Sequence, residues 1–264
     1  NHYENSRNAL LLSGARQVGK SYAIRKYGKA NYSCFVEINF IEQPEAIRIF
    51  QNATSSSDLL LRLSTFVQQT LVKGETLIFF DEVQAYPDVL TWIKFLVDSA
   101  EYKYALSGSL LGVQLNDIRS IPVGYLSEVE GFPLDFEEFL WANNYGENAI
   151  SDLYNHFLNQ QSLSKEQHEQ LLELFRRYLL VGGLPDVVNE YLATHNILNV
   201  RNLQNAIAAM YEADASQYEN NASRRLLIRR IYAMIVSQME NKKKRIVAKD
   251  IQDIKGDRFA RYVD

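Results

Sequence analysis

The chain is 264 residues long, and 47% of its residues are hydrophobic while 23% are charged. This composition excludes an intrinsically disordered chain, and the sequence has no run of about eighteen apolar residues that would span a membrane. A single cysteine, Cys34, excludes a disulfide framework and a cysteine-based zinc site. No secretory signal opens the sequence at Asn1, so we expect a cytoplasmic protein without a membrane partner.

The net charge of −4 is unevenly distributed along the chain. Residues 221–264 carry 12 Lys/Arg against 5 Asp/Glu, a balance of +7, whereas the first 220 residues have a balance of −11. A basic end on an acidic body is typical both of contact with nucleic acid and of packing between the two parts. Composition does not choose between these interpretations.

Apolar runs alternate with helix-forming stretches in the first half of the chain. We expect strands at residues 9–13, 34–40, 76–80, 103–107 and 125–129. We expect helices at residues 20–27, ending at Gly28, at residues 58–72, beginning at Asp58, and at residues 88–100. Strands separated by helices predict an α/β fold: a five-stranded parallel sheet with helices on both faces.

The second half is expected to be helical. The hydrophobic spacing predicts helices at residues 171–181, 185–191, 199–214 and 224–240. A basic loop at residues 241–245 and a short strand or helix at residues 246–254 follow in this interpretation.

Residues 14–21, GARQVGKS, fit the phosphate-loop pattern G-x-x-x-x-G-K-[ST] between an expected strand and an expected helix. Backbone N–H groups of such a loop and the positive helix N-terminus bind phosphate oxygens. We expect Lys20 to reach the β- and γ-phosphates and Ser21 to bind Mg²⁺. The side chains of Arg16 and Gln17 are expected to point outward. The nucleotide-binding set is Gly14, Ala15, Arg16, Gln17, Val18, Gly19, Lys20 and Ser21.

An apolar run, residues 77–80, ends in Asp81 and Glu82. In a P-loop fold, the acid that ends a central strand lies across from the Ser of the first helix. Asp81 would then hold the Mg²⁺ hydration shell, and Glu82 would act as general base on the attacking water.

The expected fourth strand ends in Ser107-Gly108-Ser109. A hydroxyl there, beside the strand of Asp81, is placed to bond the γ-phosphate or the water. Both serines qualify, and we favour Ser109.

These motifs resemble the bacterial and archaeal AAA-type P-loop ATPases of the archaeal-ATPase and origin-recognition branch of the AAA+ superfamily. The resemblance is carried by GARQVGKS (14–21), FFDEVQ (79–84), LSGSLLG (106–112), FPLDFEEFL (132–140) and YLLVGGLPDVV (178–188). It implies an AAA+ core at residues 1–132, a helical lid at 133–220 and a basic, truncated winged-helix-like region at 221–264. Longer members carry a further C-terminal domain of unknown function, and we expect this chain to end before it.

The resemblance also implies further site residues. A Gly-x-Pro turn at a lid helix approaches the nucleotide in related ATPases, which assigns Pro185 to the nucleotide site. Many members have an arginine where this chain has Tyr125. Arg119 lies just before that position and is the candidate arginine finger, with a solvated helix-end arginine as the alternative. At most one of Arg176 and Arg177 would sense the γ-phosphate from the lid.

Two functions fit this sequence. The first is an ATPase that hydrolyses ATP with Mg²⁺ to drive a conformational or assembly change, with Lys20, Glu82 and Arg119 as its catalytic residues. The second is a nucleotide-gated DNA-binding or protein-interaction switch with little hydrolysis. A small-molecule kinase is a weaker third candidate, and the sequence lacks the Asn-Lys-x-Asp motif of GTPases and the Leu-Ser-Gly-Gly-Gln motif of ABC ATPases. The expected partners are ATP or ADP, a second copy of the chain, DNA at the basic end, and a protein that the sequence does not identify.

Overall fold

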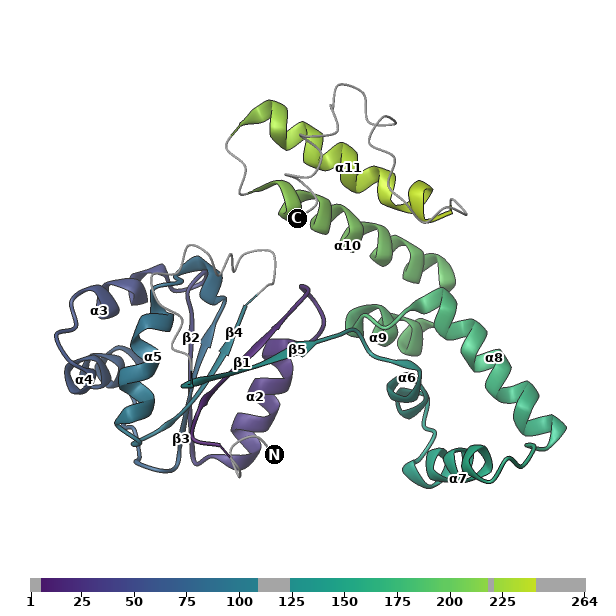
Figure 1. The fold of residues 1–264 in the computed structure, drawn as a ribbon, viewed down its shortest axis with the longest axis horizontal. Helices are drawn as coiled ribbons and strands as arrows, with labels where there is room; N and C mark the ends of the chain where they lie inside the picture. The colour runs from purple at the N-terminus through teal and green to yellow at the C-terminus, as the bar shows by residue number, and fades with distance from the viewer. Residues whose placement is uncertain (1–5, 109–123, 218–220, 241–264) are drawn as a thin grey trace. The chain divides into compact units, whose positions relative to one another are not determined.

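The computed structural model describes residues 6–108, 124–217 and 221–240. Contacts divide the chain into two units, Asn1–Ala193 and Thr194–Asp264. The first unit holds a parallel sheet with its covering helices, followed by four further helices (Figure 1). The second holds two long helices. No helix among the described residues is both long enough and apolar enough to cross a membrane.

Five parallel strands form the sheet in the order β2-β3-β4-β1-β5. Their bounds are β1 Ala9–Gly14, β2 Cys34–Asn39, β3 Thr76–Asp81, β4 Lys103–Ser107 and β5 Leu126–Gly131. The predicted parallel sheet is therefore confirmed. All six residues of β3 are buried, as expected of a central strand covered on both faces.

Helices cover both faces of the sheet, as the α/β pattern predicts. Helix α2 (Lys20–Asn31) lies on one face, and α3 (Ile47–Gln51), α4 (Ser56–Val67) and α5 (Val89–Asp98) lie on the other (Figure 1). Alternate residues of β3 separate the two cores: Leu77 and Phe79 pack toward α2, whereas Ile78 and Phe80 join the larger core. Each buried side chain of this size contributes about 1.5–3 kcal/mol.

Several expected helix ends are wrong. The helix expected at residues 58–72 ends at Val67, and the helix expected at residues 171–181 begins at Lys165. Helix α2 continues through Gly28 to Asn31, because Gly28 lies against the sheet, where a Cβ atom would come within 2.3 Å of the Phe35 ring. Helix α4 begins at Ser56, and its N-cap is Ser55, whose hydroxyl accepts a hydrogen bond from the Asp58 backbone N–H. Asp58 therefore lies in the first turn.

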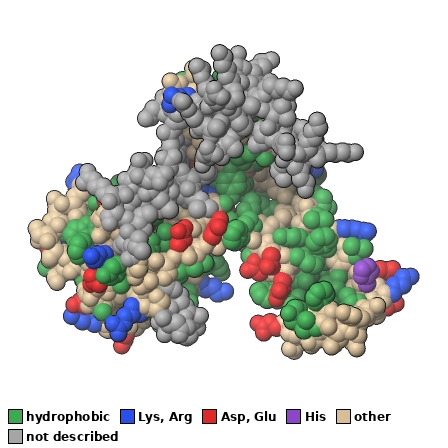
Figure 2. Space-filling model, viewed as in Figure 1, with side chains coloured by type: hydrophobic (Ala, Val, Ile, Leu, Met, Phe, Trp, Pro, Cys, Tyr) green, Lys and Arg blue, Asp and Glu red, His purple; other side chains and the backbone are tan. Residues whose placement is uncertain are grey.

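Four helices follow the sheet in the first unit: α6 (Phe136–Ala142), α7 (Glu147–Leu158), α8 (Lys165–Val181) and α9 (Pro185–Thr194). Capping boxes begin α6 and α8. An aromatic cluster joins α6, α8 and α9; its members are Phe136, Phe139, Phe175, Tyr178 and Tyr191. Hydrophobic side chains also gather on the surface of these helices (Figure 2). Phe157 of α7 and Leu179 of α8 are both exposed.

The second unit pairs α10 (Ile197–Gln217) with α11 (Ala222–Glu240). Arg229 on α11 donates through Nε to Ser216 Oγ on α10 at 3.2 Å. The expected loop at residues 241–245 and the element at 246–254 lie outside the described residues.

Candidate nucleotide site

The phosphate-loop residues connect β1 to α2 at the carboxyl edge of the sheet. Gly14 has φ +130°, and a Cβ atom there would lie 2.3 Å from the Gly131 carbonyl oxygen of β5. Gly19 caps α2 with φ +91°. Glycine is therefore required at the start of the loop by lack of space and at its end by backbone conformation. The loop delivers the N-terminus of α2 to the site.

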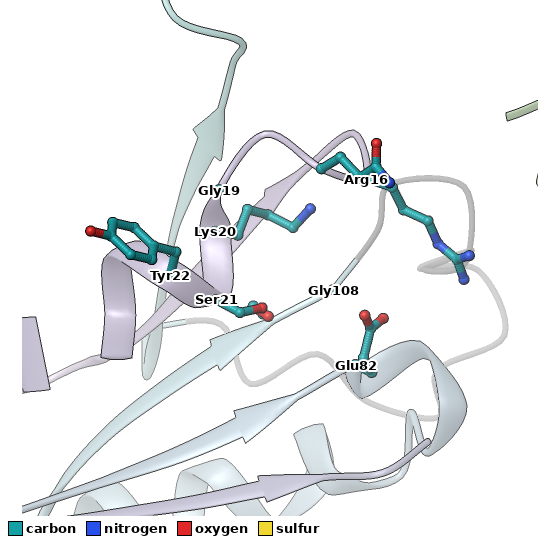
Figure 3. A pocket seen from close by; sticks show the side chains of 9 residues that line it. Arg16, Gly19, Lys20, Ser21, Tyr22, Glu82 and Gly108 are labelled. Carbon is teal, nitrogen blue, oxygen red and sulfur yellow. The ribbon is translucent and has the colours of Figure 1, made fainter. Parts of the chain in front are cut away.

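A cavity of about 190 Å³ opens at this loop (Figure 3). It is lined by Arg16, Gln17, Gly19, Lys20, Ser21, Tyr22, Glu82, Ser107 and Gly108. The structure thus brings the phosphate loop, the end of β3 and the end of β4 to one place. Parallel strands make this possible, because their carboxyl ends meet at the same edge of the sheet.

Lys20 is held by its own loop. Its Nζ donates to the carbonyl oxygens of Gly14 at 3.1 Å and Ala15 at 2.6 Å. Burial lowers the pKa of Lys20, the carboxylates of Glu82 and Asp81 oppose this, and the charge of Arg16 adds to the lowering. An ammonium has three N–H donors, so these two hydrogen bonds leave one for a phosphate oxygen.

Arg16 and Gln17 both line the cavity. The Arg16 side chain is half-buried, and its charge helps to lower the pKa of Lys20. Gln17 is exposed and also lines the cavity, with φ +61°. The phosphate-loop pattern allows any residue at these two positions, so it does not predict where their side chains point.

Asp81 lies across from Ser21, as expected from a P-loop fold. Ser21 Oγ donates to Asp81 Oδ1 at 3.0 Å, and the Glu82 backbone N–H donates to the same oxygen at 3.0 Å. Ser107 Oγ also donates to Asp81 Oδ1. Asp81 itself is only 2% exposed.

Glu82 leaves the strand in the left-handed region, with φ +56°. Its carboxylate lines the cavity and accepts a hydrogen bond from the Gln84 side-chain amide. The turn after β3 therefore directs Asp81 toward α2 and Glu82 toward the cavity.

Other predicted site residues lie at the margins of this cavity or outside the described residues. Pro185, the first residue of α9, lies beside Gly19: its Cγ is 3.6 Å from where a Cβ of Gly19 would stand. Val18 is buried in the loop. Arg119 and Ser109 lie outside the described residues.

Sequence reasoning missed three polar residues around Asp81. Arg25 and Asn39 both contact Asp81 Oδ2, and Glu37 binds Arg25. A signal for Asn39 was present, because it ends the strand next to β3. Arg25 is four residues after Ser21, and this spacing places both on one face of α2.

A phosphate loop between β1 and α2, with an acidic pair at the end of β3 of a five-stranded parallel sheet, defines a P-loop NTPase of the AAA+ type. A family model described as "AAA domain" matches residues 6–140. The match spans half of the chain, and the chain belongs to this family. Binding of a nucleotide, as the AAA domain implies, follows from that membership.

A second model, of a domain of unknown function (DUF8612), matches residues 172–264. The expectation that the chain ends before such a domain is therefore wrong. The match begins inside α8, so the domain of unknown function includes the end of α8 and all of α9 as well as the second unit.

Solved structures similar to this chain include Cdc6p from Pyrobaculum aerophilum (16% identity, 52% of this chain, 42% of that chain, TM-score 0.33). C. elegans PCH-2 has 13% identity over 75% of this chain and 59% of that chain, with a TM-score of 0.39. A point mutant of Thermotoga maritima RuvB has 14% identity over 52% of this chain and 43% of that chain, with a TM-score of 0.29. The chain spans only 42–59% of their lengths. Comparison with curated proteins finds no match.

Proposed function

We propose that the protein binds ATP with Mg²⁺ and hydrolyses it, and that hydrolysis drives a conformational or assembly change. One observation carries the proposal: the Ser21 hydroxyl lies 3.0 Å from Asp81 Oδ1 while Lys20 and Glu82 line the same cavity. A phosphate loop alone would support binding. The carboxylate of Glu82 beside it supports hydrolysis.

The donor atoms suit Mg²⁺. The described residues hold no cluster of three or more His, Cys, Asp or Glu side chains. Mg²⁺ needs no such cluster, since it commonly takes one or two protein oxygens and completes its shell with waters and substrate phosphates. Ser21 Oγ and Asp81 would supply those protein oxygens. When bound, Mg²⁺ would neutralise charge on the phosphates.

Residues of the chain would bind the phosphates and accept the proton of the attacking water. Lys20 and the N-terminus of α2 would bind the β- and γ-phosphate oxygens. Glu82 would accept a proton from the water whose oxygen attacks the γ-phosphorus, and ADP would leave with the electrons of the broken P–O bond. The Gln84 amide orients the carboxylate of Glu82 for this step.

The outer residues of the site remain proposals. Pro185, beside Gly19, would contact the nucleotide from the lid. Ser109 would sense the γ-phosphate, and Arg119 would complete the site of a neighbouring copy. DNA binding by a winged-helix-like region is proposed from the basic charge of residues 221–264.

The test is Mg²⁺-dependent phosphate release from ATP by the wild type and by Glu82→Gln, each with and without duplex DNA. We expect wild-type turnover to be lost in Glu82→Gln while ATP binding survives, because the amide cannot accept the proton. ATP binding without turnover by the wild type in every condition would overturn hydrolysis and favour the nucleotide-gated switch.

A further inference from the structure

The two oxygens of the Asp81 carboxylate have different partners. Oδ1 faces the hydroxyl of Ser21, on the side of the proposed Mg²⁺ site. Oδ2 accepts a hydrogen bond from Asn39 Nδ2 at 3.4 Å and lies 3.5 Å from Arg25 Nη2. The positively charged side chain of Arg25 therefore lies next to the carboxylate that would bind a divalent cation.

Arg25 is held by a different carboxylate. Its Nη2 lies 2.6 Å from Glu37 Oε1, and its Nε lies 2.9 Å from both Glu37 oxygens. Its single contact with Asp81, at 3.5 Å, is much longer. The Arg25 side chain is 40% exposed and that of Glu37 is 24% exposed, whereas the Asp81 side chain is 3% exposed.

This geometry sets two carboxylates in competition for one guanidinium. Arginine forms strong two-pronged bonds with carboxylates, and without Glu37 the nearest acidic group to Arg25 would be Asp81. A full Arg25–Asp81 ion pair would neutralise the carboxylate and turn it toward α2. Both effects would weaken binding of Mg²⁺.

We infer that Glu37 is a positioning residue: it holds Arg25 away from Asp81 and so keeps the Asp81 carboxylate available to Mg²⁺. The inference rests on the proposed function, because it concerns the same nucleotide and metal site. It assigns roles to two residues, on β2 and α2, that lie outside the phosphate loop and the acidic pair.

The inference predicts that a substitution at Arg25 reverses the effect of a substitution at Glu37. Glu37→Gln should raise the Mg²⁺ concentration needed for half-maximal nucleotide binding by about five- to twentyfold. An effect of this size is expected when the charge of Arg25 pairs with the carboxylate of Asp81 in a partly buried site. Arg25→Gln alone should not raise it. The double variant Arg25→Gln/Glu37→Gln should return to within about twofold of the wild type, since the competing charge is gone.

The experiment is a Mg²⁺ titration of the binding of a fluorescent ADP analogue, which requires no hydrolysis. Glu101→Gln is the matched control: it makes the same change in another ion pair, Lys73–Glu101 at 2.8 Å, next to the amino end of β4 and away from the cavity. Thermal unfolding followed by circular dichroism shows that each variant is folded.

The outcomes separate the two proposals. An unchanged Mg²⁺ requirement in Glu37→Gln, or a double variant as impaired as Glu37→Gln, overturns the role of Glu37 alone. Normal Mg²⁺-dependent binding without phosphate release by the wild type overturns hydrolysis alone. Failure of the wild type to bind nucleotide overturns both.

Discussion

At the scale of single residues, two buried serine hydroxyls on the neighbouring strands β4 and β1 have opposite environments. Ser107 on β4 is 1% exposed and donates to Asp81 Oδ1. Ser13 on the adjacent strand β1 is 5% exposed, and its hydroxyl has no hydrogen-bond partner in the described part of the chain. The two serines therefore form a matched pair for measuring what the hydrogen bond to Asp81 contributes.

Ser107→Ala should lower the free energy of unfolding by about 1.5–3 kcal/mol, because it removes a hydrogen bond to a buried charged group. Ser13→Ala should leave it unchanged or raise it, since the hydroxyl removed is buried without a partner. Urea denaturation of both variants and the wild type measures the difference. Equal losses in the two variants would contradict the assigned hydrogen bond.

At the scale of elements, the close packing of α2 against the sheet depends on Gly28. Alanine is a better helix former than glycine by about 1 kcal/mol, so propensity alone predicts that Gly28→Ala stabilises the protein. The structure predicts the opposite, because the new Cβ would lie 2.3 Å and 2.5 Å from two ring carbons of Phe35. Overpacking of this kind costs about 1–3 kcal/mol.

We therefore expect Gly28→Ala to lower the midpoint of chemical unfolding and to weaken nucleotide binding, since α2 carries Lys20 and Ser21. Gly146→Ala is the control, because a Cβ at Gly146 meets no atom within 4 Å. A Gly28→Ala variant as stable as Gly146→Ala would show that α2 does not pack so closely on β2.

The sheet could be predicted because most of its strands contain a short apolar run and helix-forming stretches separate these runs. Helices α3, α6 and α7 were missed, since α3 and α6 are short and α7 has no buried residue to give a strong periodic signal. The phosphate loop and the acidic pair follow a known spacing, so their residues were placed. The Arg25–Glu37 pair was not, because it links an exposed helix face to a neighbouring strand and depends on packing rather than on a motif.

At the scale of the whole molecule, the basic charge of the chain lies in the C-terminal part. Helix α11 exposes four arginines, Arg224, Arg225, Arg229 and Arg230. The proposed DNA contact predicts that affinity for duplex DNA falls steeply with salt, because each neutralised phosphate releases counterions.

Replacing Arg225 and Arg230 with alanine should weaken duplex binding and reduce the slope of log affinity against log salt. The reduction should be about one for each DNA phosphate that the variant no longer neutralises. Fluorescence anisotropy over a salt series measures both quantities. Arg62→Ala, which alters an exposed arginine on α4, is the control. No measurable binding of the wild type at about 50 mM salt would contradict a DNA partner.

We propose that the two adjacent carboxylates at the end of β3 have different roles: Asp81 holds Mg²⁺ and Glu82 activates water. The most informative measurement is a single-turnover assay in which binding of ATP and release of phosphate are followed separately. It is carried out on Asp81→Asn and Glu82→Gln at rising Mg²⁺ concentrations. We expect Asp81→Asn to lose the Mg²⁺ dependence of ATP binding, whereas Glu82→Gln should bind Mg²⁺ and ATP normally and release no phosphate. Equal loss of Mg²⁺-dependent binding in both variants, or phosphate release by Glu82→Gln at the wild-type rate, would contradict it.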